Sequence, residues 1–278
     1  MVAAFSPLMP QSASPISFNR FGPKPSIWNK LQLPSKAILG GVAQLLLSRY
    51  LPGEWAFVPL GICVAIAAIG HLAAPKPSAP PSYIPPTGTS AQFPEADGTY
   101  SNKPSSRSLV VLHLGVQSNH PNGFAAPGFK ETSDWFMEMH HDLMSKREEY
   151  GLLSASHWQP APSNGQTSMA VYYFRDLEAL NKFAHDPIHR RYWDAFVALK
   201  KPYVGVFHEL FEVPAGNWES TYLNCQPVSL GAATVPIEDP VDGSKRWANV
   251  LVSSRNPVLK SMWSRMGRQQ NGEQKEGY

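Results

Sequence analysis

The residues best suited to acid–base chemistry are His208 and Glu209, which stand together in the apolar stretch VGVFHELFEV at 204–213. Side chains of a β-strand alternate, so the two must point to opposite faces of a sheet. A histidine titrates near neutral pH, as a general base should. Two interpretations stay open: one residue acts as base or ligand inside a cavity, or the two form a satisfied structural pair, because an unpaired buried charge is costly.

His189 is a second candidate, on a predicted helix that it shares with Trp193 and Phe196. It either lines a cavity or packs at the edge of the core. His185 lies four residues earlier, a spacing that suits two metal ligands on one helical face. Asp186-Pro187 interrupts that helix, however, so we expect no metal site here.

Three more polar residues follow the apolar stretch, in WESTYLNCQP: Glu219, Tyr222 and Asn224. They form either the mouth of a cavity or a surface loop. His113 lies in another apolar stretch, and it faces either the cavity or the helices.

Several classes of function are excluded by what the sequence lacks. It contains no GxGxxG, P-loop, GxSxG or HExxH motif, so nothing indicates a nucleotide cofactor, phosphoryl transfer, a serine nucleophile or a standard zinc protease. Cys63 and Cys225 are the only cysteines, which excludes a disulfide framework and a cysteine-based zinc site. The net charge of +3 is too small to indicate a nucleic-acid partner.

The elements that must position these residues alternate between strand and helix. Apolar runs bounded by Gly, Pro and Asn predict strands at 108–116, 152–158, 168–174 and 204–213. Helical spacing with polar caps predicts helices at 134–150, 177–184 and 187–199. The order is β-α-β-β-α-β, which predicts an α+β, ferredoxin-like domain.

All four predicted strands carry apolar residues in both alternating sets, whereas helices on one side cover only one face of a sheet. A second copy of the chain would cover the other face, so we expect a homodimer. Such a dimer encloses an apolar cavity suited to a small molecule.

The N-terminal third has a different composition. Residues 1–36 are rich in Ser and Pro and are expected to be disordered. Residues 37–75 are predicted to anchor the chain in a membrane, with 55–74 as the span, because 20 residues without a charge form a helix about 30 Å long. Both a single pass and a hairpin are compatible, and we expect an endomembrane location. A Pro-rich linker at 76–106 and a C-terminal tail at 233–278 would then flank a module at 107–232.

FAHDPIHRRYWDAF (183–196), the segment 204–227 and SLG (229–231) resemble a monooxygenase-like family of fungi and bacteria. Its members have the dimeric α/β-barrel fold, and in fungi they often accompany enzymes of secondary metabolism. The resemblance covers about residues 105–232.

The resemblance implies an enzyme that oxygenates an apolar intermediate without a nucleotide cofactor. His208, Glu219 or His189 would act as the base, and Trp193, Tyr222, Asn224 and Glu209 would position the substrate. The same fold also carries haem enzymes, with His208 or His189 as the iron ligand, as well as cyclases and dehydratases. A binding module without catalysis is the remaining alternative.

Overall fold

The computed structural model describes residues 3–16, 18, 33–51, 53–58, 60–62, 64–65, 88–158, 166–269 and 271–273. The chain divides into two compact units, one formed by Met1–Asn19 with Ser82–Tyr278 and the other by Arg20–Pro81. Each unit is described by itself.

The smaller unit contains helix α2 (Leu33–Tyr50) and the 3₁₀-helix η1 (Gly53–Phe57), joined by a hydrogen bond of 3.0 Å from Gln44 Nε2 to the carbonyl oxygen of Ala56. The predicted membrane span at 55–74 begins within η1, and its last nine positions lie outside the described residues.

Among the described residues, no helix is both long enough and apolar enough to cross a membrane. Helix α2 has 18 residues, about 27 Å of length against the roughly 30 Å of a hydrocarbon core. It also carries Gln44, Ser48 and Arg49. The predictions of an N-terminal transmembrane segment and a membrane location are therefore wrong. Both predictions relied on the number of consecutive uncharged residues in the sequence. No described helix is long and apolar enough to match that run.

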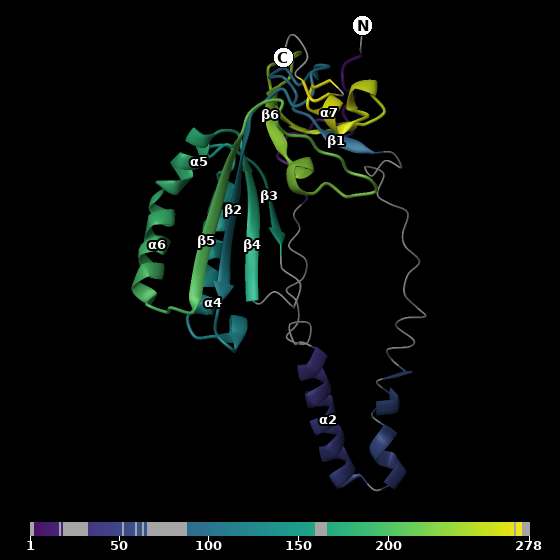
Figure 1. Ribbon diagram of the computed structural model, residues 1–278, viewed down its shortest axis with the longest axis vertical. Helices are drawn as coiled ribbons and strands as arrows, with labels where there is room; N and C mark the ends of the chain where they lie inside the picture. The colour runs from purple at the N-terminus through teal and green to yellow at the C-terminus, as the bar shows by residue number, and fades with distance from the viewer. Residues whose placement is uncertain are drawn as a thin grey trace. The chain divides into compact units, whose positions relative to one another are not determined.

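The larger unit is built on a four-stranded antiparallel sheet of β2 (Leu109–Ser118), β3 (Leu152–Trp158), β4 (Gln166–Phe174) and β5 (Val204–Val213). The spatial order is β3-β4-β2-β5, so β2, the first of these four strands along the chain, lies in the interior of the sheet (Figure 1). The predicted β-α-β-β-α-β order is confirmed.

Helices α4 (Phe129–Ser145), α5 (Leu177–Ala184) and α6 (Pro187–Leu199) accompany the sheet. Asp176 caps α5 and Asp186 caps α6, each by accepting a backbone N–H bond. Helix α4 begins five residues before the predicted start, at the left-handed Gly128 (φ 88°). Thr132 lies inside the helix and donates its hydroxyl to the Gly128 carbonyl.

The register divides the sheet into two faces. On the helix side, Val110, Leu112, Tyr172 and Phe174 pack with Leu143, Leu180 and Phe183 from the helices. Residues paired across neighbouring strands share a face. Leu114 pairs with His208, which places His208 on the helix side, whereas His113 pairs with Glu209 and Val171 on the opposite face.

A second layer covers one end of that opposite face. Strand β1 (Thr89–Ala91) pairs with β8 (Leu251–Ser253), and β6 (Thr234–Glu238) pairs with β7 (Lys245–Asn249). Together with the 3₁₀-helix η4 (Ser229–Ala232), they bury a cluster against the sheet. Its members from the sheet and the added layer include Leu109, Val111, Tyr173, Val213, Phe93, Trp218 and Leu230.

This layer uses segments that we had assigned to the N-terminus, the linker and the C-terminal tail. Phe5 is buried against Tyr100, Val252 and Leu259, and Pro7 bridges to Val252. Beyond β8, the tail contains η5 (Pro257–Leu259) and the short helix α7 (Met262–Arg265). The short 3₁₀-helix η2 (Gly123–Ala125) precedes α4.

Candidate active site

The part of the second sheet face that the added layer leaves uncovered has a histidine and a carboxylate at its centre. We call this surface the open half-face, and it consists of His113, Gly115, Trp158, Met169, Val171, Phe207, Glu209 and Phe211. His113 Nδ1 lies 3.5 Å from Glu209 Oε2, and both side chains are accessible, at 30% and 65%.

Aromatic rings surround this pair. Phe211 meets the His113 ring edge to face, with ring centroids 5.4 Å apart. Phe207 lies across Gly115, where an added Cβ would come within 2.3 Å of its Cζ. Glycine at this position therefore lets an aromatic ring lie flat on the sheet. The result is an apolar floor with one polar pair in it.

This arrangement suits proton removal from an apolar molecule. A carboxylate beside one imidazole nitrogen orients the ring. The other nitrogen is then available to accept a proton from a bound molecule. The separation of 3.5 Å is an ion-pair distance, longer than an ordinary hydrogen bond.

The structure places the predicted bases His208 and His189 on the helix side of the sheet. His208 is exposed on the edge strand β5. His189 packs edge to face on Phe183, with centroids 5.5 Å apart. Burial lowers the pKa of His189, and the charge of His208 lowers it further. Trp193 on the same helix is 53% exposed, and its ring lies 6.0 Å from Phe196.

The remaining predicted residues lie in the added layer and are not brought together with His208. Glu219 forms an ion pair of 2.5 Å with Arg265. The Tyr222 hydroxyl accepts the Gly231 N–H at 2.9 Å, and burial raises the pKa of Tyr222 to about 12. Asn224 is exposed with a left-handed backbone (φ 54°). Tyr222 therefore holds the layer to η4, and Glu219 holds α7.

Sequence reasoning missed a second histidine group, on the helix side under α4. The Nδ1 atom of the buried His140 lies 3.1 Å from the Tyr172 hydroxyl. The His157 ring meets that of His140 edge to face, with centroids 4.7 Å apart. A bulge between Leu152 and Ser154 shifts the alternation of β3, so His157 turns to the helix side with Leu152. Strict alternation would predict the opposite.

Among the described residues, no group of three or more His, Cys, Asp or Glu side chains could hold a metal ion. His140 and His157 thus form a pair rather than a metal centre. We find no residue set in this part of the chain that identifies a haem site.

Comparison with known proteins gives a family model and a relative that match this chain. A family model described as monooxygenase af470-like matches residues 109–230. Monooxygenase af470 of Aspergillus fumigatus is 36% identical over 247 residues, which cover 86% of this chain and 89% of that protein.

Solved structures give weaker matches. SnoaB, a cofactor-independent oxygenase from Streptomyces nogalater, is 15% identical over 37% of this chain and 91% of its own, with a TM-score of 0.28. An aldoxime dehydratase in complex with butyraldoxime is 18% identical over 45% of this chain and 36% of its own, with a TM-score of 0.36. Likenesses this weak carry no functional assignment.

The buried His140 predicts how stability depends on pH. Burial, and after it the neighbouring His157 and His141, lower the pKa of His140 from 6.5 to about 3. Between these two values the unfolded chain binds more protons than the folded one, so stability falls as pH falls from about 6.5. One such group changes the free energy of unfolding by about 1.4 kcal/mol per pH unit.

His140→Gln keeps a hydrogen-bonding group near Tyr172 but does not titrate. Urea unfolding between about pH 7 and pH 4 should therefore show a smaller loss of stability than in the wild type. Tyr172→Phe is the matched control, since it removes the hydroxyl and leaves His140 to titrate. An unchanged slope in His140→Gln would show that His140 is protonated in the folded protein.

Proposed function

We propose, from the premise that this chain belongs to the monooxygenase af470-like family, that it oxygenates an apolar small molecule on the open half-face. The family resemblance predicted from the sequence is confirmed by 36% identity across most of both chains. That membership is the observation that carries the proposal. The geometry adds a histidine–carboxylate pair on an apolar, aromatic floor within the matched residues.

In the proposed reaction His113 removes a proton from an acidic C–H of the substrate, and Glu209 stabilises the imidazolium. The carbanion transfers its electrons to dioxygen and forms a C–O bond, giving a peroxide that takes the proton back from His113. Loss of water then leaves a carbonyl, so R₂CH₂ and O₂ become R₂C=O and H₂O. The substrate supplies all the electrons, and no nucleotide cofactor is needed.

The apolar floor supports an oily or aromatic substrate. Phe207 and Phe211 are 37% and 48% exposed, which leaves ring faces available to stack on a planar molecule. An intermediate of secondary metabolism has this character, and we keep it as the proposed substrate class. His208 and His189, with Glu219, stay the alternative bases, and haem bound by His208 or His189 stays the alternative chemistry.

We also propose that a second copy of the chain covers the open half-face and closes the site. Exposed aromatic residues support this: Trp158, Phe207 and Phe211 lie on one surface that the described layers of the protein leave open. Water would be excluded from the reaction, as carbanion chemistry requires.

Sedimentation of the full chain tests the dimer. The wild type should dimerise, and Phe207→Glu should weaken the dimer at least about a hundredfold, because it buries a charge without a partner in each copy. Val197→Glu is the control, since Val197 is 58% exposed on α6 at the other side of the sheet. A monomeric wild type, or equal weakening by both variants, would contradict the interface.

The reaction is tested with the metabolite that accumulates when the gene is deleted, incubated with purified protein under ¹⁸O₂. We expect one ¹⁸O atom in the product without added NADH or NADPH. His113→Gln should lower kcat by about 10²–10⁴-fold, the usual contribution of a general base.

His208→Gln is the matched control and should keep most of the activity. If it abolishes turnover while His113→Gln does not, the base lies on the helix side. A Soret band in the purified protein would establish the haem alternative, and turnover without oxygen uptake would indicate a cyclase or dehydratase. Turnover with no loss in either variant would contradict both base assignments.

A further inference from the structure

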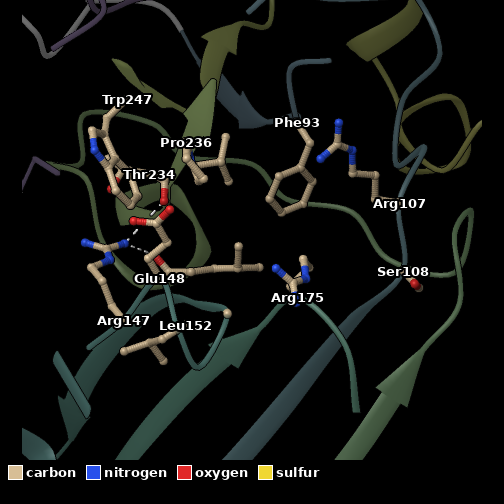
Figure 2. A pocket seen from close by; sticks show the side chains of 13 residues that line it. Phe93, Arg107, Ser108, Arg147, Glu148, Leu152, Arg175, Thr234, Pro236 and Trp247 are labelled. Atoms are coloured by element: carbon tan, nitrogen blue, oxygen red, sulfur yellow. Dashed lines mark hydrogen bonds between the residues drawn. The ribbon is translucent and has the colours of Figure 1, made fainter. Parts of the chain in front are cut away.

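A pocket of about 280 Å³ lies at one end of the sheet, away from the His113–Glu209 pair. Its walls come from the turn after α4, the start of β3, and strands β6 and β7. Figure 2 shows Arg147, Thr234 and Trp247 on one side of it, with Phe93 and Arg107 across from them. The volume is close to the lower limit of small-molecule sites, about 300 Å³.

Arg147 is a buried cation on this wall, only 7% exposed. Its Nη2 donates to the carbonyl oxygens of Leu153 (2.5 Å) and Thr234 (3.3 Å). Its Nε is buried and has no hydrogen-bond partner among the described residues. None of the ion pairs in that part of the chain includes Arg147. Burial lowers the pKa of Arg147 to about 10, which leaves it charged at neutral pH.

Thr234 adds a second unsatisfied group to the same wall. It is 1% exposed, and its Oγ1 also has no hydrogen-bond partner among the described residues. Folded proteins satisfy nearly all buried polar groups, and a buried charge usually has a counter-ion. An unpaired guanidinium N–H and an unpaired hydroxyl that line one cavity therefore indicate an anion that supplies both partners.

The other charged residues around the pocket each have a partner of opposite charge. Arg107 and Arg175 also line it, and each meets a carboxylate outside the lining, Glu95 at 3.6 Å and Asp176 at 2.7 Å. Glu148 contributes a carboxylate to the lining, but Lys245 pairs with it. Arg147 is thus the one guanidinium of the described lining that no carboxylate pairs.

The rest of the wall is apolar, which restricts the anion further. Phe93, Val235 and Trp247 face the cavity, and the Trp247 ring also lies 5.7 Å from the Arg147 guanidinium. Inorganic anions gain nothing from such contacts, whereas a carboxylate joined to a hydrocarbon or aromatic body uses both parts of the wall. A guanidinium fork also matches a planar carboxylate.

We propose that this pocket binds a small organic acid, with its carboxylate on Arg147 and Thr234 and its apolar body against Phe93 and Trp247. Arg107 and Arg175 attract the anion from the pocket rim. The ligand class is a monocarboxylate about the size of benzoate. This binding site does not depend on the oxygenation proposed for the open half-face.

Isothermal titration of the full chain with benzoate tests the proposal. We expect saturable binding of one benzoate per chain, with benzamide at least about tenfold weaker because it has no charge. Inorganic phosphate should also bind at least tenfold more weakly than benzoate, since it makes no use of the apolar wall. Equal binding of benzoate and benzamide, or of benzoate and phosphate, would overturn the assignment.

Variants separate a ligand site from a structural one. Thr234→Val removes the unsatisfied hydroxyl, so it should keep or raise the melting temperature yet weaken benzoate about tenfold. Arg175→Gln should weaken benzoate severalfold, whereas Glu148→Gln should strengthen it because a negative charge leaves the lining. These variants avoid Arg147, whose two carbonyl contacts could make its loss a folding defect.

Arg191→Gln is the matched control, because this exposed arginine of α6 pairs with Glu138 and does not line the pocket. It should bind benzoate as the wild type does. Folded Thr234→Val and Arg175→Gln with wild-type affinity would overturn the proposal, as would weaker binding in Glu148→Gln.

Discussion

The four-stranded sheet is apolar in both of its alternating sets, so water must be excluded from both of its faces. Val110, Leu112 and Phe174 turn to one side, and Leu109, Val111 and Tyr173 turn to the other. The helices α4, α5 and α6 satisfy the first requirement with side chains of their own. The second is satisfied only in part, by a layer drawn from the N-terminus, the segment before β2 and the C-terminal strands.

The part of the second face that the added layer leaves uncovered contains the candidate site. At the covered end Trp218 donates its indole N–H to the Arg107 carbonyl and packs on Phe93, which holds the added layer against the sheet. Beyond it, His113 and Glu209 stand among exposed aromatic rings. Both side chains are accessible, so this pair contributes little to stability. Its place among exposed aromatic rings leaves it available to a bound molecule.

Much of the sheet and its helices could be predicted from local patterns, because the periods of strand and helix are strong signals. The starts of α5 and α6 were predicted correctly, because the caps Asp176 and Asp186 act on their own neighbours in the sequence. Contacts between distant segments left no such signal. The burial of Phe5 against Val252 and the pairing of β1 with β8 join parts of the chain more than 150 residues apart.

The candidate site was harder to predict than the fold for the same reason. The alternation of side chains correctly placed His208 and Glu209 on opposite faces. Both alternating sets of β5 contain apolar residues, however, so the local sequence does not indicate which face the helices cover. The packed helices decide this, and they place His208 on their own side. The prediction of a membrane span failed for a different reason: the uncharged run at 55–74 is long, yet no described helix is long and apolar enough to match it.

The central claim is that the small molecule reacts on the open half-face and not between the sheet and its helices. The most direct test is methyl-labelled NMR of the full chain with the accumulated metabolite added under anaerobic conditions, where binding occurs without turnover. The account predicts shifts at Val111, Met169 and Val171 on the open half-face or its border. Shifts confined to Leu143, Leu180 and Met139 under the helices would contradict it.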